Sequence, residues 1–236
     1  MPDLRHAQTI SVVMVTLNEE AAIAKVVADI RTVVPGAEVV VVDSSGDATA
    51  EIAAAAGCRV IRQVPPRGYG PALAEGLRSA QGEIVVTLDC DGTYPVEAIP
   101  QMVAALDGGL DMVNGSRLQH KPAAMPIGNY LANVAFAFLA RALCSVHTSD
   151  VHSGMRAYRK SLLAAFAYDP DGMALPVELL VGPVQSGYRV GELFIDYRPR
   201  IGESTLRPLP GTLWTLRRLW KWRRRPQART LEGERR

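Results

Sequence analysis

Residues 83–93, EIVVTLDCDGT, decide the fold. The apolar, β-branched run at 83–88 predicts a buried strand, and Gly92 favours a turn just after it. Asp89 and Asp91 follow the end of that strand, two positions apart. Carboxylates at this spacing offer the hard oxygen ligands that Mg²⁺ and Mn²⁺ prefer, so we take both as candidate metal ligands. Such a pair also occurs in ordinary turns, and the flanking sequence has to decide.

The same strand–loop–helix pattern recurs on both sides of this stretch. Strands are predicted at 10–16, 38–42, 59–63 and 111–114, and helices at 19–33, 49–56, 71–80 and 95–106. This order predicts an α/β fold with a mostly parallel sheet flanked by helices on both faces. Because parallel strands end at one edge, the polar segments 16–20, 43–49 and 89–94 are expected to meet there.

The pattern changes in the second half of the chain. Helices are predicted at 125–144 and 176–185, and a strand at 189–197. The segment 131–146 is apolar but contains Asn133 and Arg141 and is shorter than the ~20 residues of a membrane span, so it is expected to pack as a helix of the domain. No internal repeat is visible.

Composition limits the class of protein. Of the 236 residues 48% are hydrophobic, which suits a globular core, and the net charge is only +2. Cys58, Cys90 and Cys144 lie far apart, which argues against a disulfide framework or a zinc knuckle. Residues 1–8 lack the apolar core of a signal peptide. We expect a cytoplasmic protein that could also bind peripherally to the inner face of the membrane.

Several polar residues at the predicted edge have two readings. Asp43 could accept hydrogen bonds from a nucleoside, whereas Asp47 and Glu20 could bind a donor or simply cap the next helix. Gly68 precedes a predicted helix, where backbone amides could bind a phosphate, or it belongs to a plain turn.

Six segments in order resemble one known family. Residues 16–20, 43–49, 67–72, 89–93, 114–117 and 153–160 are similar to the GT-A glycosyltransferases of family 2, in the dolichol-phosphate mannosyltransferase-like branch (polyprenol-phosphate sugar synthases). The resemblance covers residues 9–208. It implies a GT-A (Rossmann-like) fold, a UDP- or GDP-sugar donor, Mg²⁺ or Mn²⁺, and inversion at the anomeric carbon. Because the pattern changes after residue 117, we place a nucleotide-sugar half of the domain 1–208 at 1–117 and an acceptor half at 118–208.

The motifs and the resemblance together give the expected site. Asp89 and Asp91 would bind the metal, and Asp91, Arg117 and Asp150 would be catalytic. The acceptor would contact Ser153, Asn129 and Glu178. The expected donor-binding residues are Thr16, Asn18, Glu20, Asp43, Asp47, Gly68, Asp89, Cys90, Asp91, Arg117, Arg156, Arg200 and Ser204.

The acceptor is less well determined by the motifs. Many lipid-phosphate members of the family have Gln where this chain has Thr93, and the arginine that usually binds the lipid phosphate has no clear counterpart. A phosphate acceptor is already anionic near pH 7, but a hydroxyl acceptor needs a general base. Asp150 is the expected base, and Glu178 is a second candidate that could instead pair with an arginine.

A basic tail is predicted at 209–236. Leu213, Leu216, Leu219 and Trp220 share one face of a predicted helix, and arginines cluster elsewhere on it. Residues 213–225 could therefore lie at a membrane interface, or pack against the body of the protein. No nucleic-acid-binding motif accompanies the charge, so no nucleic-acid partner is expected.

Three functions are compatible with the sequence. The first is transfer of a hexose from a UDP- or GDP-sugar to a polyprenyl phosphate. The second keeps the donor but uses a soluble hydroxyl acceptor, such as a small metabolite. The third is a non-catalytic nucleotide-sugar binding protein, which the acids Asp89 and Asp91 argue against.

Overall fold

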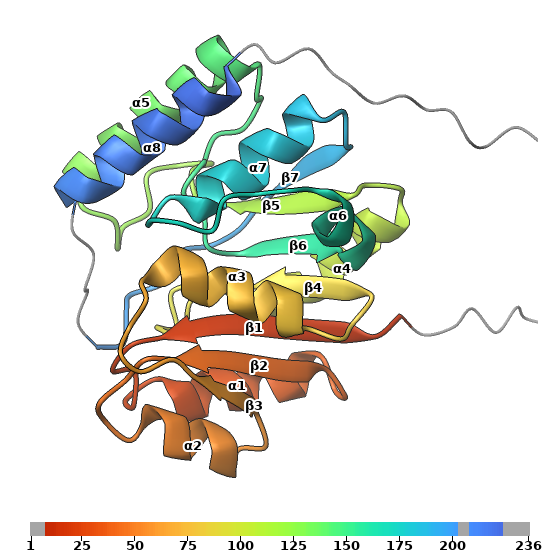
Figure 1. Ribbon diagram of the computed structural model, residues 1–236, viewed down its shortest axis with the longest axis vertical. Helices are drawn as coiled ribbons and strands as arrows, with labels where there is room; N and C mark the ends of the chain where they lie inside the picture. Colours follow the sequence, from red (N-terminus) through yellow and green to blue (C-terminus); the bar gives the residue numbers. More distant parts are fainter. Residues whose placement is uncertain (1–7, 203–207, 224–236) are drawn as a thin grey trace, which may run out of the picture.

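The computed structural model describes residues 8–202 and 208–223, and its centre is one seven-stranded sheet (Figure 1). The strand order is β3-β2-β1-β4-β6-β5-β7, and every strand except β6 runs in the same direction. The predicted α/β fold with a mostly parallel sheet is confirmed. The strands are β1 (Ile10–Thr16), β2 (Glu38–Asp43), β3 (Arg59–Arg62), β4 (Ile84–Thr87), β5 (Met112–Ser116), β6 (Arg156–Arg159) and β7 (Val190–Phe194).

Helices cover both faces of the sheet. On one face lie α1 (Ile23–Val33), α2 (Thr49–Ala55) and α4 (Ile99–Asp107), which follows the short 3₁₀ turn η1 (Val96–Ala98). The other face carries α3 (Tyr69–Ser79), α5 (Ile127–Cys144), α6 (Lys160–Ala165), α7 (Leu175–Gln185) and α8 (Pro208–Trp222). The central strands are apolar throughout because both of their faces are buried: in β1, Val12 and Met14 face one core and Val13 the other.

Strand β6 brings a distant segment to the edge where the parallel strands end. It lies between β4 and β5 and is antiparallel to both, with Arg156 opposite Thr87 and Asn114. Because β6 runs backwards, its amino end lies where the carboxyl ends of its neighbours lie. Residues 153–156 therefore join the polar loops that follow β1, β2 and β4 at one rim.

The first helix begins later than the pattern predicts. α1 begins at Ile23 rather than at residue 19, because Asn18 has a left-handed backbone, with φ of 59°, and a turn follows it. The Glu19 carbonyl accepts hydrogen bonds from the amides of Ala22 and Ile23, both at 3.0 Å. This turn keeps residues 17–20 at the rim instead of on the helix.

Helices α5 and α8 lie side by side on the outside of the molecule (Figure 1). Within the described ranges, α5 alone has a length and mean hydropathy (1.3) that would suit a membrane span, and only 17% of it is buried. Its inner residues Ala137, Ala140 and Cys144 do pack on the body, so the predicted packing holds for one side of the helix.

The predicted tail begins with a helix that is tied to the domain. Leu219 and Trp222 of α8 belong to the core. Arg218 is buried and forms an ion pair with Glu178 of α7, and the ammonium of Lys221 lies 2.8 Å from Glu178 Oε1. Residues 208–222 are thus part of the fold.

Candidate active site

The first corner of the rim is built by neighbouring strands. Thr16 and Asp43 are paired in register at the ends of β1 and β2, and the Thr16 hydroxyl donates to Asp43 Oδ1 at 2.7 Å. The Ser45 hydroxyl donates to the same oxygen at 2.6 Å, and Arg62 forms an ion pair with Oδ2. Asp43 is fully buried, so it is held in one orientation at the end of the strand.

Three further residues expected to bind the donor join two loops together. Asn18 Oδ1 accepts from the Gly46 amide at 3.0 Å, and Glu20 Oε2 accepts from the Ala48 amide at 3.1 Å. Asp47 Oδ2 accepts in turn from the Glu20 amide at 3.3 Å. These contacts set the shape of the corner around Asp43.

Asp91 lies at the centre of the rim and is 1% exposed. Its Oδ1 accepts hydrogen bonds from the Thr93 amide at 2.9 Å and the Thr93 hydroxyl at 2.6 Å. Its Oδ2 lies 2.5 Å from Arg200 Nη2, in an ion pair. Cys90, between the two acids, points into the core, so only its backbone is available at the rim.

Arg200 connects Asp91 to Glu19, an acid that the sequence motifs do not single out. Its Nη1 lies 3.8 Å from Glu19 Oε1. The segment around Arg200 runs beside the loop of Asp91, because the Ile201 amide donates to the Asp91 carbonyl at 2.8 Å. Ser204, expected in the same donor-closing loop, lies outside the described residues.

Asp89 is met by two other motifs. Tyr69 follows Gly68 at the start of α3, and its hydroxyl lies 3.3 Å from Asp89 Oδ1. Gly154 approaches from the amino end of β6, so closely that a Cβ there would lie 2.7 Å from Asp89 Oδ2. Glycine at position 154 is therefore required for this approach.

The acids at the rim are crowded. Burial and the charge of Asp91 raise the pKa of Asp89 to about 6, and the same two causes raise the pKa of Glu19 to about 7. Carboxylates that resist ionisation in this way are suited to a divalent cation, which adds the missing positive charge. The described residues contain no group of three or more acidic, His or Cys side chains arranged for a metal. Asp89 and Asp91 fit a cation that takes its remaining ligands from a bound diphosphate or water.

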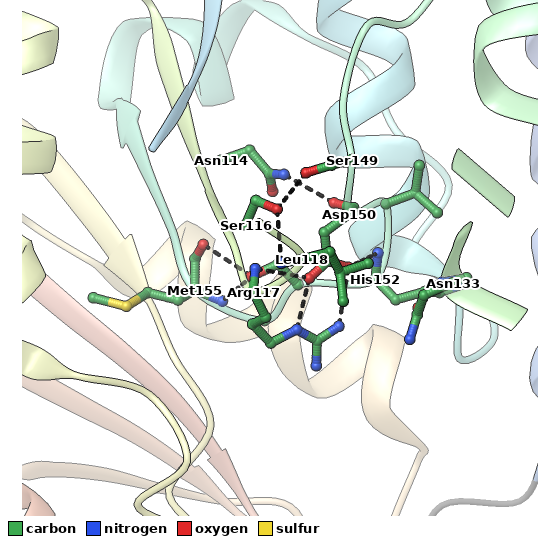
Figure 2. A network of polar contacts seen from close by, with 12 residues as sticks. Asn114, Ser116, Arg117, Leu118, Asn133, Ser149, Asp150, His152 and Met155 are labelled. Carbon is green, nitrogen blue, oxygen red and sulfur yellow. Dashed lines mark hydrogen bonds and ion pairs between the residues drawn. The ribbon is translucent and has the colours of Figure 1, made fainter. Parts of the chain in front are cut away.

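Arg117 and Asp150 form the most tightly defined pair of the site (Figure 2). Arg117 Nε lies 2.6 Å from Asp150 Oδ2, and Nη2 lies 3.0 Å from Oδ1. Asp150 is fully buried, which would raise its pKa, but the charge and hydrogen bonds of Arg117 hold that pKa below its ordinary value. The guanidinium also lies 5.3 Å from the ring centroid of Tyr197 and 5.8 Å from that of Tyr94.

Arg156, expected to contact the donor, is 1% exposed and bonded inside the protein. Its Nε donates to Asn114 Oδ1 at 2.9 Å, its Nη2 donates to the Val151 carbonyl at 2.9 Å, and its Nη1 donates to the Pro176 carbonyl. Ser153 is also fully buried, with its hydroxyl 3.2 Å from the Met155 amide. Both side chains thus lie inside the protein, and Arg156 is linked to Asp150 through Asn114, whose Nδ2 donates to the Asp150 carbonyl at 2.8 Å.

The remaining acceptor candidates lie elsewhere in the described contacts. Glu178 is fully buried and bonded to Arg218 and Lys221 of α8, as the alternative reading of an internal ion pair expects. Asn129 is exposed on α5, and its carbonyl accepts from Asn133 Nδ2 at 2.9 Å. No described contact joins either side chain to the acids at the rim.

Known proteins are similar to this chain in sequence. The family model described as Glycosyl transferase family 2 matches residues 11–166. A dolichyl-phosphate hexose transferase from Haloferax volcanii is 43% identical over 203 residues, which are 86% of this chain and 88% of that protein. The low-salt glycan biosynthesis hexosyltransferase Agl6 of the same organism is 33% identical over 212 residues, which are 86% of this chain and 51% of that protein.

Solved structures share the fold. Glucosyl-3-phosphoglycerate synthase from Mycobacterium tuberculosis, in complex with Mn²⁺, UDP-glucose and phosphoglyceric acid, superposes with a TM-score of 0.73 and 28% identity, over 92% of this chain and 80% of that one. The same synthase with Mg²⁺ and UDP gives a TM-score of 0.74 and 28% identity, over 94% and 82% of the two chains. The GT-A fold expected from the six motifs is confirmed. On this evidence the chain belongs to glycosyl transferase family 2 and is a glycosyltransferase.

Proposed function

We propose that this glycosyltransferase moves a hexose from a UDP- or GDP-sugar to a polyprenyl (dolichyl-type) phosphate, with inversion at the anomeric carbon. The main support is that neither candidate general base is free to accept a proton. Asp150 and Glu178 are both fully buried and both ion-paired with basic side chains. A hydroxyl acceptor needs a base within reach, whereas a phosphate monoester is largely anionic near pH 7 and attacks without one.

The donor would lie along the rim. Thr16 and Asp43 would bind the nucleoside, with Asn18, Glu20 and Asp47 supporting the corner, and Gly68 and the Cys90 backbone would line the path of the diphosphate. Asp89 and Asp91 would bind Mg²⁺ or Mn²⁺, which neutralises charge on the leaving nucleotide. Arg200 and Ser204 would close over the bound donor, with Arg200 moving from Asp91 and Glu19 to the donor phosphates.

Arg117 would contact the transferred sugar or the acceptor phosphate. Its bidentate pairing with Asp150 leaves Nη1 without a hydrogen bond to the described residues. A guanidinium that is fixed at two nitrogens can direct the third at an anion with little loss of side-chain entropy. We therefore assign Asp150 the task of positioning Arg117 rather than that of a general base. Arg156, through Asn114, and the buried Ser153 would support this pair from inside the protein.

One observation favours a second candidate function. The M. tuberculosis synthase that shares this fold has been solved with phosphoglyceric acid, a small soluble acceptor. Transfer to the hydroxyl of a small metabolite therefore remains the alternative, and it requires a base other than a paired Asp150.

The test is an acceptor screen with the purified enzyme. UDP-glucose, GDP-mannose and related donors are incubated with Mn²⁺ and either a short polyprenyl phosphate or phosphoglyceric acid, and products are identified by mass spectrometry. We expect a polyprenyl-phosphate sugar that does not form in EDTA. A product on phosphoglyceric acid alone supports the second candidate, and no product with any pair contradicts both.

A further inference from the structure

Exposed apolar side chains gather on two neighbouring helices. The described residues include ten large apolar side chains that are strongly exposed, and seven of them lie on α5 and α8. The most exposed of these seven are Leu213 at 70%, Phe138 at 69% and Trp220 at 60%. α5 and α8 are packed side by side (Figure 1), so these side chains form one surface, which we name the α5–α8 surface. Its apolar residues are Ile127, Leu131, Val134, Phe138, Leu213, Leu216 and Trp220.

The charge of this surface has one sign. Neither α5 nor α8 contains an acidic residue. The exposed charges outside ion pairs are basic: Arg141 on α5, Arg217 on α8, and Arg223 just after it, whose guanidinium lies 3.6 Å from the Trp220 ring centroid. Lys221, also on α8, is ion-paired with Glu178 and Asp169. A partner for this surface must therefore combine apolar depth with negative charge. Two copies of the chain paired face to face would place like charges together, which disfavours self-association.

The two helices lie along the body of the protein and do not project from it. The inner side of α5 is buried through Ala137, Ala140 and Cys144, and α8 is anchored by the buried Arg218. A helix covered by protein along one side cannot be surrounded by lipid, so α5 is unsuited to crossing a bilayer alone. An apolar outer side with basic residues and Trp at its border instead suits helices that lie in the plane of a membrane interface.

Hydrogen bonds connect the α5–α8 surface to the candidate active site. The His152 imidazole lies between the two helices, with Nδ1 3.0 Å from Asn133 Oδ1 and Nε2 2.9 Å from Thr215 Oγ1. The His152 amide donates to Asp150 Oδ1 at 3.1 Å, and Asp150 holds Arg117 (Figure 2). A membrane bound at this surface would lie on the side of the site where Arg117 is fixed.

We propose that the α5–α8 surface binds an anionic lipid bilayer, with both helices parallel to the membrane plane. Phe138, Leu213 and Trp220 enter the boundary between headgroups and acyl chains, and the arginines contact lipid phosphates. This proposal rests on the proposed function in one respect: it gives the enzyme access to a lipid phosphate while the catalytic rim stays in water.

The test is vesicle flotation of the full chain. We expect the protein to float with vesicles of phosphatidylcholine and phosphatidylglycerol, and to float less with phosphatidylcholine alone or in high salt. Phe138→Gln and Trp220→Gln should each lower the bound fraction severalfold, and the double variant by about tenfold or more, because each removes apolar area from the lipid. Arg217→Gln should weaken binding to the anionic vesicles only.

The matched control is Phe194→Gln, which removes a 47% exposed aromatic side chain from β7, outside this surface, and should leave flotation unchanged. Circular dichroism checks that each variant is folded. Wild-type flotation by the double variant, or no flotation of the wild type, contradicts the proposal. The proposal is also contradicted if the wild type does not bind vesicles but forms a dimer in sedimentation that the double variant disrupts. Vesicle binding without any glycolipid product leaves this surface in place and removes the proposed function, and a product made in detergent without vesicle binding does the reverse.

Discussion

The pair of Arg117 and Asp150 illustrates how burial decides the role of a single carboxylate. The sequence suggests a base, because Asp150 lies just before the segment that resembles an acceptor motif. In the fold both of its oxygens face the Arg117 guanidinium, and its lowered pKa makes it a poor proton acceptor. Its charge keeps Arg117 ionised and oriented at the rim.

Asp150→Asn should slow transfer through loss of Arg117 orientation, not through loss of a base. We expect kcat to fall by about a hundredfold, since small misplacements at a reacting centre have such effects. Breaking a buried ion pair should also lower the free energy of unfolding by about 3–5 kcal/mol. The pH profile of the remaining activity should keep its shape. A lost acidic limb in the kcat profile, or turnover equal to the wild type, contradicts this role; Asp107→Asn, at an exposed acid, is the control.

Asp89 makes a prediction about stability and pH. Its pKa is raised from 3.8 to about 6, so between these values the folded state binds more protons than the unfolded state. Stability therefore falls as pH rises through this window. Asp89→Asn removes the effect and should raise the free energy of unfolding by about 1–2 kcal/mol at pH 7.5 in EDTA, with no gain near pH 3.5. Urea unfolding at the two pH values measures it, and an equal or lower stability of the variant at pH 7.5 contradicts it.

Some residues of the site could not be chosen from sequence. Glu19 and Glu20 are adjacent acids, and the sequence pattern does not show which of them the turn between β1 and α1 directs toward the rim. The left-handed Asn18 turns Glu19 toward Arg200 and leaves Glu20 on the loop of Asp47. Asp89 and Asp91 could be chosen because two acids directly after a buried strand end must lie at the rim. Arg156 was expected at the donor for its motif, but motifs do not reveal that carbonyls of two other segments surround it.

At the scale of elements, α8 is a structural helix with one apolar side left exposed. Arg218→Ala should destabilise the protein by about 3–5 kcal/mol, because it leaves the buried carboxylate of Glu178 with Lys221 as its remaining charged partner. Arg217→Ala, at the exposed neighbouring position, should change stability by less than about 1 kcal/mol. Urea midpoints of the two variants give the comparison, and equal effects contradict the assigned anchoring.

Gly154 tests the approach of β6 to the acids. Gly154→Ala should place a Cβ 2.7 Å from Asp89 Oδ2 and force that carboxylate to move. We expect Mn²⁺-dependent nucleotide binding to weaken by about tenfold or more, as for other changes beside metal ligands. Gly128→Ala on α5, where a Cβ meets nothing within 4 Å, should bind as the wild type does and gain up to about 1 kcal/mol of stability. Calorimetry distinguishes them, and normal binding by Gly154→Ala contradicts the expected clash.

The elements themselves were predictable to different degrees. The run at Ile10–Thr16 was predicted with the correct bounds because a strand buried on both faces has a continuous apolar sequence. The direction of β6 was not predictable, because the sequence of a four-residue strand does not indicate which strands it pairs with. The packing of α8 on α7 was also left open, because an amphipathic helix suits a membrane or a protein core equally well.

In the whole molecule, the candidate site residues lie along one edge of the sheet. β1, β2, β4 and β5 end there, β6 begins there, and the segment of Arg200 lies beside the loop of Asp91. The α5–α8 surface is joined to the same edge through His152. The molecule thus places the buried corner of Asp43, the neighbouring acids Asp89 and Asp91 and the fixed Arg117 along one edge.

We propose above all that Asp89 and Asp91 bind a divalent cation that in turn binds the donor diphosphate. Isothermal titration of UDP and GDP into the wild-type enzyme and Asp91→Asn, each in Mn²⁺ and in EDTA, tests it directly. We predict that one nucleotide binds the wild type in Mn²⁺, and that EDTA or the substitution weakens binding by about a hundredfold. Equal affinity in Mn²⁺ and EDTA, or unchanged affinity in Asp91→Asn, would contradict it.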